Sequence, residues 1–281
     1  MKYVKYLKRQ RDLSILNKDF FYSVGDYGWR VYRAMVNAFK FIGDVFGALG
    51  RIVFRRTNTR CADWASAFAD VGPRAVMIVS LISFLIGLIL AFVGAAQLKL
   101  FGAQVYVASL VAIAAIRIMG AMMTGIIMAG RTGASYAATI GTMQVNEELD
   151  ALQTMGINKI DFLVLPRLTA MIICMPILTM LSDFVAILGG AFIGIVMMGI
   201  PAAEYISFTT AALDLQNFMV GIFHGLVYGI IIALCGCYYG LNCGRNAGAV
   251  GYATTRAVVM SIVLMIVATG IITFLFELLG I

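Results

Sequence analysis

Charged residues are scarce in this sequence: only 12% of its 281 residues are Asp, Glu, Lys or Arg, whereas 62% are hydrophobic. Soluble globular domains average about 25% charged and about 45–50% apolar residues, so this composition excludes that class. The short alternating segments of a transmembrane β-barrel are also missing. What is present is a set of continuous apolar runs longer than the roughly 18 residues that cross a bilayer core. The sequence therefore predicts an all-α polytopic membrane protein.

Groups that carry catalysis are equally few. His224 is the only histidine, and no His, Cys, Asp or Glu cluster has the spacing of metal ligands. The five cysteines form no zinc pattern, and we interpret them as small apolar packing residues. There is no nucleophile–base arrangement and no G-x-x-x-x-G-K-[ST] phosphate-binding loop. We therefore expect a non-catalytic protein that needs no metal or other cofactor.

Basic residues are concentrated near the N-terminus, where residues 1–60 hold thirteen of the twenty-one Lys and Arg. Next to membrane spans, the positive-inside rule and attraction to anionic headgroups explain such a cluster better than nucleic-acid binding does. Residues 1–19 are predicted to form a cytosolic arm. Residues 20–54 mix apolar, aromatic and basic side chains, which favours a helix in the membrane interface over an amphipathic helix packed on a bundle. We therefore divide the chain into an N-terminal region, 1–60, and a membrane domain, 61–281.

Five apolar runs are predicted to span the membrane, at about 76–96, 105–128, 162–199, 218–240 and 257–279. Residues 61–73 are expected to be a polar joint, and residues 241–256 a cytosolic loop. The third run is long for one span, so a tight pair of spans is the alternative. No charged turn divides it, and Pro176 kinks rather than ends a helix at membrane depth, which favours one long helix. The charge distribution predicts a cytosolic N-terminus, and the odd number of spans then places the C-terminus outside.

Three ionisable residues of these runs need an explanation: Arg117, Asp183 and His224. A charge at membrane depth is costly unless it has a partner. We interpret Arg117 and Asp183 as a buried charge pair or as contacts for a lipid headgroup. In a secondary carrier or channel they would instead provide ion coupling or selectivity. For His224, a packed and hydrogen-bonded role is the simpler interpretation.

One long polar segment, residues 129–167, interrupts the apolar sequence and contains four of the fourteen acidic groups. It is predicted to contain a short helix over 147–155, with Asn146 as its N-cap. Glu147 and Glu148 then occupy the first turn, where the helix dipole favours anions.

The rest of this segment adds an apolar stripe at three-residue spacing: Leu149, Leu152 and Met155. Gly156 is a natural stop for the helix. Small residues between 130 and 141 permit close backbone packing before it. On these features alone, a docking helix for a soluble partner and a loop on the membrane surface are equally good interpretations.

The polar segment resembles the signature of the MlaE/YrbE permease family, and it reads AGRTGASYAATIGTMQVNEELDALQTMGINKIDFLVLPR. A second match at residues 253–259, ATTRAVV, is similar to the family's segment at the start of its last span. Members of the family are membrane subunits of ABC transporters that work with MCE-domain lipid-binding proteins. The resemblance covers about residues 65–281 and includes the number of spans.

The resemblance implies a permease subunit that pairs with a second copy of itself around a lipid-sized cavity. One ABC ATP-binding subunit per copy would dock between the second and third spans, and an MCE-domain protein would lie on the periplasmic side. Phospholipid would pass between the bacterial inner membrane and that assembly. The residues expected to couple to the ATPase are Arg131, Glu147, Glu148, Leu149, Asp150, Leu152 and Met155. Those expected on a lipid pathway are Arg117, Asp183 and His224.

Two departures from the family pattern concern this lipid pathway. The family often has R-E-L-G-P in the second span, whereas here Arg117 is followed by Ile118-Met119-Gly120-Ala121. The carboxylate that would neutralise Arg117 locally is therefore missing. His224 stands where family members often carry Lys. The alternative function is an ATPase-independent secondary carrier or channel for an amphipathic solute.

Overall fold

The computed structural model describes residues 25, 28–29, 32–33, 35–51 and 61–280, and divides the chain into two compact units, Met1–Gly50 and Arg51–Ile281. In the first unit, residues 35–50 are helical, as predicted for that part of residues 20–54. The basic arm predicted at residues 1–19 lies outside the described residues. Whether the helix lies in the membrane interface stays a prediction.

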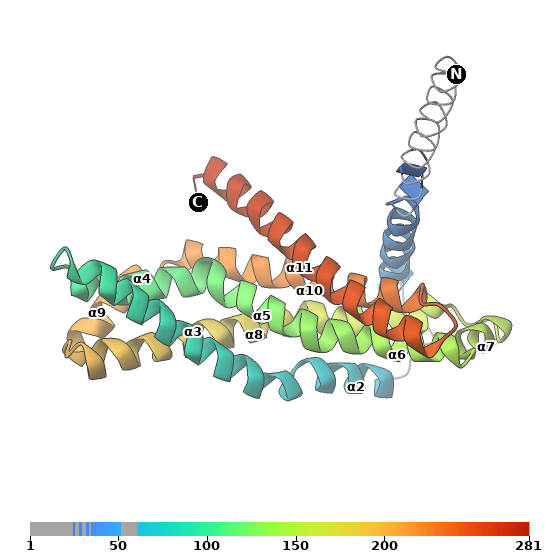
Figure 1. Cartoon of the computed structure of the whole chain (residues 1–281), viewed down its shortest axis with the longest axis horizontal. Helices are drawn as coiled ribbons and strands as arrows, with labels where there is room; N and C mark the ends of the chain where they lie inside the picture. The colour runs from blue at the N-terminus through green and yellow to red at the C-terminus, as the bar shows by residue number, and fades with distance from the viewer. Residues whose placement is uncertain (1–24, 26–27, 30–31, 34, 52–60, 281) are drawn as a thin grey trace, which may run out of the picture. The chain divides into compact units, whose positions relative to one another are not determined.

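The second unit is built from long helices (Figure 1). In its described part, five are long and apolar enough to cross a membrane: Trp64–Lys99, Gln104–Val145, Ile160–Met197, Leu215–Leu241 and Ala247–Leu278. None of the described residues is in a strand. The all-α polytopic fold and its five spanning helices are therefore confirmed.

The first spanning helix is α2 (Cys61–Val71) followed by α3 (Pro73–Lys99), with only Gly72 between them. The prediction of a polar joint at 61–73 is therefore corrected, because those residues are helical apart from the turn at Gly72. Pro73 at the start of α3 has no N–H to satisfy in the first helical turn, so a new helix begins at once. The backbone N–H of Gly72 still donates to the carbonyl of Phe68 at 2.9 Å.

The second spanning helix is assembled from short pieces end to end: η1 (Gln104–Tyr106), α4 (Val107–Ala114), η2 (Ala115–Met119), α5 (Gly120–Met128), η3 (Ala129–Gly133) and α6 (Ala134–Val145). It therefore continues well past residue 128, where the predicted span ends. The segments η2 and η3 are π-helical, and they carry Arg117 and Arg131. π-Helical turns inside α-helices often mark functional positions.

The third run forms one helix, as predicted: η4 (Ile160–Val164), α8 (Leu165–Phe192), which contains Pro176, and η5 (Ile193–Met197). The helix α9 (Ala202–Ala212) then precedes α10 (Leu215–Leu241). The last helix, α11 (Ala247–Leu278), begins ten residues earlier than predicted, so the loop is shorter than 241–256. Asn246 starts it, because its Oδ1 accepts a hydrogen bond from the N–H of Ala249 at 2.7 Å.

Glycines set the closest approaches between these helices. A Cβ built at Gly87 of α3 would overlap the carbonyl of Ala186 in α8, and one at Gly189 would overlap the carbonyl of Phe84. Beside them, the hydroxyls of Ser83 and Ser182 lie 2.7 Å apart and share a hydrogen bond. Membrane helices lack a hydrophobic driving force against lipid, so close packing of this kind holds them together.

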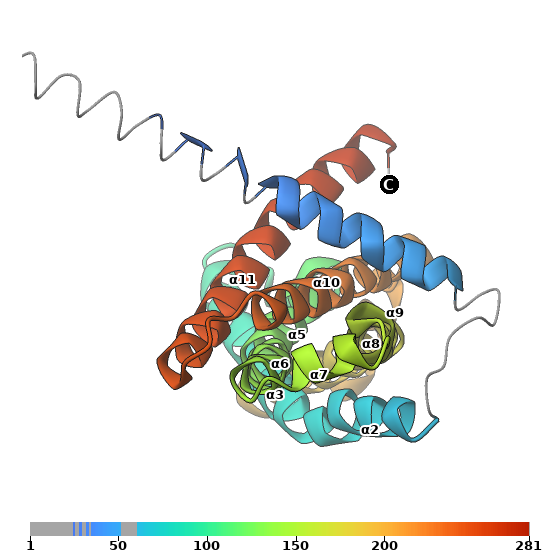
Figure 2. The ribbon, with the colours of Figure 1, turned by 90° about the vertical axis from the view of Figure 1, so that its right-hand side faces the viewer.

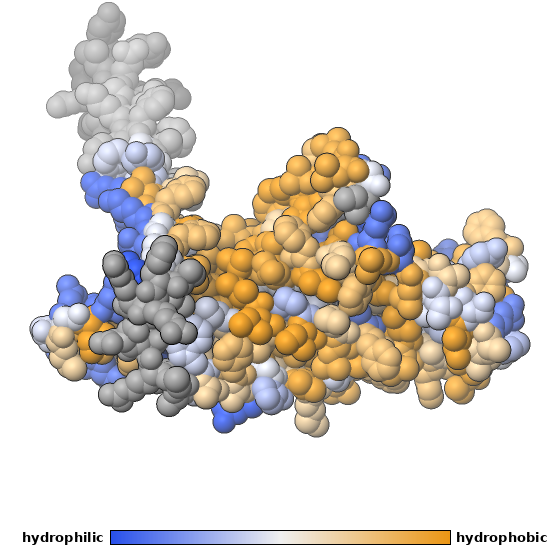
Figure 3. Space-filling view, turned by 180° about the vertical axis from the view of Figure 1, so that it is seen from behind, coloured by the Kyte–Doolittle hydropathy of each residue, from blue (hydrophilic) through white to orange (hydrophobic). Residues whose placement is uncertain are grey.

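The helix α8 packs against α2, α3, α5 and α10, and α10 packs in turn against α6 and α11. Seen from the α7 end, α2 and α11 lie on opposite sides of the bundle (Figure 2). The helix α11 packs on α6 and α10 and diverges from α10 toward its C-terminal end (Figure 1). Apolar side chains cover the middle of the bundle, and hydrophilic ones gather toward its ends (Figure 3). This distribution is the one expected of a protein that spans a hydrocarbon layer.

The glycine contact between α3 and α8 can be tested by replacing Gly87 with Ala. The added methyl group has no space, and overpacking of this kind typically costs about 1–3 kcal/mol. We expect a lower apparent Tm in detergent, measured by thermal unfolding. The control is Gly251→Ala in α11, where nothing lies within 4 Å and Ala favours the helix. Equal Tm values for the two variants would contradict the packing argument.

Candidate functional site

The short helix α7 (Glu148–Thr154) joins the second and third spanning helices. Asn146 ends α6 with near-helical backbone angles, and its Nδ2 donates to Oε1 of Glu148 at 3.1 Å. The prediction that Asn146 is the N-cap is wrong, because Asn146 is the C-cap of α6 and α7 begins only at Glu148. Glu147 occupies that position instead, in the left-handed region at φ 61° and ψ 11°.

The end of α7 is the one predicted. Gly156 has φ 74°, a conformation that glycine adopts without steric cost. Its N–H donates to the carbonyl of Gln153 at 3.1 Å, and the N–H of Ile157 donates to the carbonyl of Leu152 at 3.0 Å. These two bonds form a Schellman motif, which satisfies carbonyls that the last turn of a helix leaves open.

Contacts within the chain fix the position of α7. Leu149 is only 1% exposed, so its side chain packs inside the protein and is not part of the surface. The carboxylate of Asp150 lies 2.8 Å from the guanidinium of Arg245 and 3.7 Å from Nζ of Lys159. The helix is therefore tied both to the link before α11 and to the start of the third spanning helix.

The surface that α7 leaves open consists of its acidic start and its apolar end. Glu147 and Glu148 are exposed, Leu152 is half-buried, and Met155 is 69% exposed. Of the predicted stripe, only its C-terminal part therefore faces outward. An exposed acidic and apolar surface on a fixed helix is suited to binding a soluble partner.

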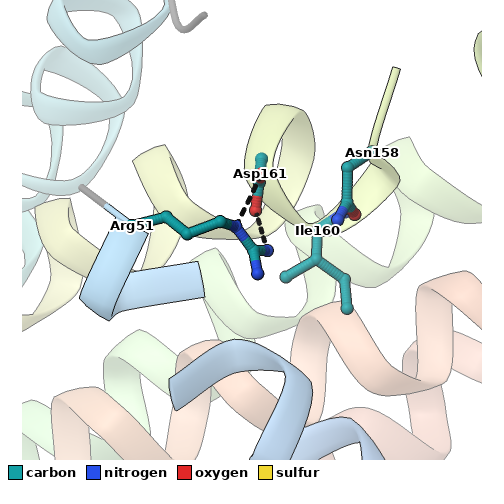
Figure 4. A network of polar contacts seen from close by, with 4 residues as sticks. All are labelled: Arg51, Asn158, Ile160 and Asp161. Carbon is teal, nitrogen blue, oxygen red and sulfur yellow. Dashed lines mark hydrogen bonds and ion pairs between the residues drawn. The ribbon is translucent and has the colours of Figure 1, made fainter. Parts of the chain in front are cut away.

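A bidentate ion pair joins Arg51 to Asp161 of η4 (Figure 4). Arg51 donates from Nε to Oδ2 of Asp161 at 3.2 Å and from its terminal nitrogen to Oδ1 at 2.6 Å. Oδ1 of Asn158 accepts a hydrogen bond from the N–H of Ile160, the first residue of η4, at 3.0 Å. Two parallel charge-assisted bonds fix the geometry better than a single contact does. No local sequence signal joins residues that are 110 positions apart.

Arg131 lies on η3, away from the ion pairs of α7. Its guanidinium donates to the backbone carbonyl of Asp70 at 3.0 Å. The structure therefore does not bring Arg131 into contact with the six coupling residues predicted between 147 and 155. Its coupling role stays a prediction.

Arg117 finds a neutral partner inside the bundle. Its guanidinium donates to Oδ1 of Asn217, near the start of α10, at 2.8 Å. No hydrogen bond joins Arg117 to Asp183, since neither carboxylate oxygen of Asp183 has a hydrogen-bond partner among the described residues. Asn217 was not a predicted site residue, because an amide 100 positions away carries no signal as a partner.

Asp183 is 3% exposed and lies against Gly120, where a Cβ would overlap its Oδ1. It borders an apolar cavity of about 420 Å³ between η2, α8 and the start of α10. The lining residues are Ile116, Met180, Asp183, Phe184, Ile187, Leu213, Asp214, Leu215 and Phe218. Arg117 and Asp183 thus lie on neighbouring elements without forming the predicted pair.

His224 is fully buried on α10. Its Nδ1 lies 2.8 Å from the carbonyl of Val220, and its ring contacts Tyr228 edge to face at 5.8 Å between centroids. These contacts agree with a packed, hydrogen-bonded histidine. Its Nε2 has no partner in the described part of the chain.

A second cavity follows the side of α10 that faces the diverging end of α11. Its volume is about 530 Å³, and its lining is almost entirely apolar: Leu215, Gln216, Met219, Val220, Ile222, Phe223, Leu226 and Phe276. The ring of Phe276 meets Phe223 edge to face across this groove, at 5.7 Å between centroids. A groove of this size and lining is suited to acyl chains.

Comparison with known proteins agrees with this architecture. Residues 64–275 match the model of the family described as Permease MlaE. A probable ABC transporter permease protein from Rickettsia typhi is 36% identical over 152 residues, which cover 54% of this chain and 59% of that protein. Another from Synechocystis is 31% identical over 196 residues, or 70% of this chain and 73% of that protein. One from the red alga Porphyra purpurea is 31% identical over 170 residues, or 60% and 64%.

The match to the family model includes the five spanning helices, apart from the ends of the first and last, and the whole of α7. The aligned stretch spans about three fifths of the length of the Rickettsia relatives. The family model covers most of the described second unit without interruption. The chain therefore belongs to the MlaE permease family.

Proposed function

We propose that this chain is the membrane subunit of an ABC transporter that moves phospholipid between the bacterial inner membrane and a periplasmic MCE-domain assembly. The observation that carries the proposal is the family match over residues 64–275, supported by relatives named as probable ABC transporter permeases. A separate ATP-binding subunit supplies the energy, and this chain is not itself an enzyme. The N-terminus is cytosolic and the C-terminus periplasmic in this arrangement.

The ATP-binding subunit docks on α7. Its exposed glutamates and Met155 provide the surface, and the Asp150–Arg245 and Asp150–Lys159 pairs hold the helix rigidly against the bundle. A fixed helix transmits a displacement to the spanning helices instead of absorbing it. Arg131 contributes to coupling indirectly: it stabilises the packing of η3 through its hydrogen bond to Asp70 and does not itself contact the ATP-binding subunit.

A second copy of the chain packs along α11. Only 17% of the most apolar window of this helix is buried within the chain, against 50% for α10. Between Val259 and Leu275 its exposed residues are apolar, and the α10–α11 groove opens beside them. Pairing two such grooves would enclose a space for the two acyl chains of a phospholipid.

The polar groups of the bundle fit a subordinate role in this function. Arg117 donates to the neutral side-chain amide of Asn217, and we assign its positive charge to attracting the phosphate of a lipid headgroup. Family membership favours this transport mechanism over an ATPase-independent carrier, for which Arg117 and Asp183 would be the coupling charges.

Reconstitution tests the function as a whole. The chain, co-expressed with its ATP-binding and MCE-domain partners, is expected to move fluorescent phospholipid between proteoliposomes and acceptor protein only when ATP is hydrolysed. A catalytically dead ATPase is the control. Transfer that persists without ATP but requires an ion gradient would instead establish the carrier.

Charge reversal tests the docking surface. We expect the double variant Glu147→Lys, Glu148→Lys to lose at least about tenfold in co-purified ATP-binding subunit, because like charges placed against each other at an interface cost several kcal/mol. Glu204→Lys, an exposed glutamate on α9, is the matched control. Unchanged recovery of the ATPase with the double variant would rule out this contact.

Cysteine cross-linking tests the second copy. Single cysteines at Val259, Val263 or Val267, which are 47–53% exposed on α11, are expected to form a disulfide-linked dimer in membranes. Met77→Cys on α3, where the native side chain is 83% exposed, should remain monomeric. A dimer formed through position 77 and none through α11 would place the interface elsewhere.

A further inference from the structure

A polar pocket of about 440 Å³ lies where α2 meets α3, beside η3, α6 and the start of α8. Three guanidinium groups and one carboxylate border it, together with hydroxyl groups of α6. The residues that carry the argument are Asp70, Arg74, Arg131, Tyr136, Thr139 and Arg167. No part of the α7 surface or of the α10–α11 groove contributes to its lining.

Positive charge exceeds negative charge in this pocket. Asp70 forms an ion pair with Arg74, one turn away. Arg131 donates to the backbone carbonyl of Asp70 at 3.0 Å, and Arg167 to that of Leu163 at 2.7 Å. Neither Arg131 nor Arg167 forms an ion pair with a residue that the structure describes. Each guanidinium has five N–H donors, so most of them stay available.

The arginines are held in place before any ligand binds. The guanidinium of Arg167 stacks over the ring of Tyr136 at 5.6 Å from its centroid, and the Tyr136 hydroxyl donates to the carbonyl of Arg167. Tyr136 itself is only 5% exposed. Preorganised guanidinium groups lose little rotamer entropy when they bind a planar or tetrahedral oxyanion.

Each of the three arginines lies where an apolar run meets polar sequence. Apolar sequence begins just after Arg74, ends just before Gly130-Arg131, and begins again just after Arg167. At such a boundary, the phosphates of a bilayer are the anions present at highest concentration. Oxyanion recognition by paired guanidinium groups is typical of phosphate binding.

A smaller pocket of about 210 Å³ adjoins the first and shares Asp70, Tyr136 and Arg167 with it. Its other lining includes the apolar side chains of Ala67, Met143 and Phe162. The combined space therefore offers a cationic part and an apolar part side by side, as a ligand with a phosphate group and a glycerol or acyl portion requires.

We propose that this arginine pocket binds the phosphate ester group of a phospholipid or of a soluble glycerophosphate, with Arg131 and Arg167 as its two principal ligands. Arg74 pairs with the carboxylate of Asp70, and the backbone carbonyl of Asp70 positions Arg131. The pocket is separate from the proposed transport groove, and its evidence is independent of the transport function. A permease that moves no lipid at all would still have this site.

Binding to the purified full-length chain tests the proposal. Native mass spectrometry of delipidated protein is carried out with dioleoylphosphatidylglycerol, with dioleoylglycerol, which lacks the phosphate, and with glycerol 3-phosphate. We expect phosphatidylglycerol to bind at least tenfold more tightly than dioleoylglycerol. Binding of glycerol 3-phosphate with equal affinity identifies a soluble ligand, and its failure to bind identifies the lipid; either supports the phosphate site.

Variants assign the site to these residues. Arg131→Gln and Arg167→Gln are each expected to weaken binding of the phosphate ligand about tenfold or more, and Arg131→Lys less, because it keeps the charge but not the fork. Lys99→Gln, an exposed cation at the other end of α3, is the control and should bind normally. If the glutamine variants fail to fold, Thr139→Phe replaces them in the test. Thr139 lies at the exposed edge, and the larger side chain should block binding by filling the pocket without removing a charge.

Three results would overturn the proposal. The first is equal binding of dioleoylglycerol and phosphatidylglycerol, and the second is unchanged binding by the pocket variants. The third is normal phospholipid binding by Arg131→Gln together with loss of the co-purified ATP-binding subunit, which would make the pocket a protein contact.

Discussion

Direct contact between helix backbones is the constraint on which the rest of this structure depends. Gly87 and Gly189 bring α3 against α8, and Gly221 brings α10 against η2, where a Cβ would overlap the carbonyl of Ile116. At the other end of the bundle, Gly236 packs on the backbone of Gly133. Between lipid tails, burial of apolar surface does not drive helices to associate. Dispersion contacts at close range must therefore hold them together. Each larger residue at these positions would separate the helices that carry the sites.

Polar groups are placed where this packing permits them. Arg117 meets an amide at the start of α10, and Asp183 is confined against Gly120 beside a cavity. Toward the α6–α7 end, the ionic groups gather in two sets. One contains Asp150 and Asp161 with their cations, which hold α7 and the start of the third spanning helix. The other is the arginine pocket, in which cations outnumber carboxylates. In the first set the charges neutralise one another and hold the structure, whereas the arginine pocket keeps hydrogen-bond donors available for a ligand.

The two π-helical segments place Arg117 and Arg131 on the same spanning helix. η2 carries Arg117 and η3 carries Arg131, about four turns apart on one continuous helix. A π-helical turn widens the helix and changes which face a side chain occupies. Because α6 continues from η3 to the turn before α7, the helix that bears both arginines also ends at the proposed docking surface. One continuous helix therefore runs from Arg117 to the turn before the proposed docking surface.

The length of the apolar runs predicted the fold class, the five spans and the undivided third helix, and the conformational freedom of glycine predicted that α7 ends at Gly156. These are local properties, since 18 or more apolar residues must adopt a helix to satisfy their backbone in lipid. The family resemblance likewise rests on contiguous motifs, and it was confirmed. Local signals were weaker at helix ends: residues 61–71 and 247–256 are helical although a polar joint and a loop were predicted there, and the second spanning helix continues past its predicted end at 128.

Only the tertiary structure decided which residues meet. It gave Arg117 an amide partner rather than Asp183, placed Glu147 rather than Asn146 at the start of α7, and buried Leu149. It also assembled the arginine pocket from the first three spanning helices, none of which carries a recognisable site alone. The physical reason is that composition and periodicity report on neighbours along one helix. Contacts between residues about 60 to 110 positions apart depend on how closely the helices approach, which the packing of the whole bundle sets.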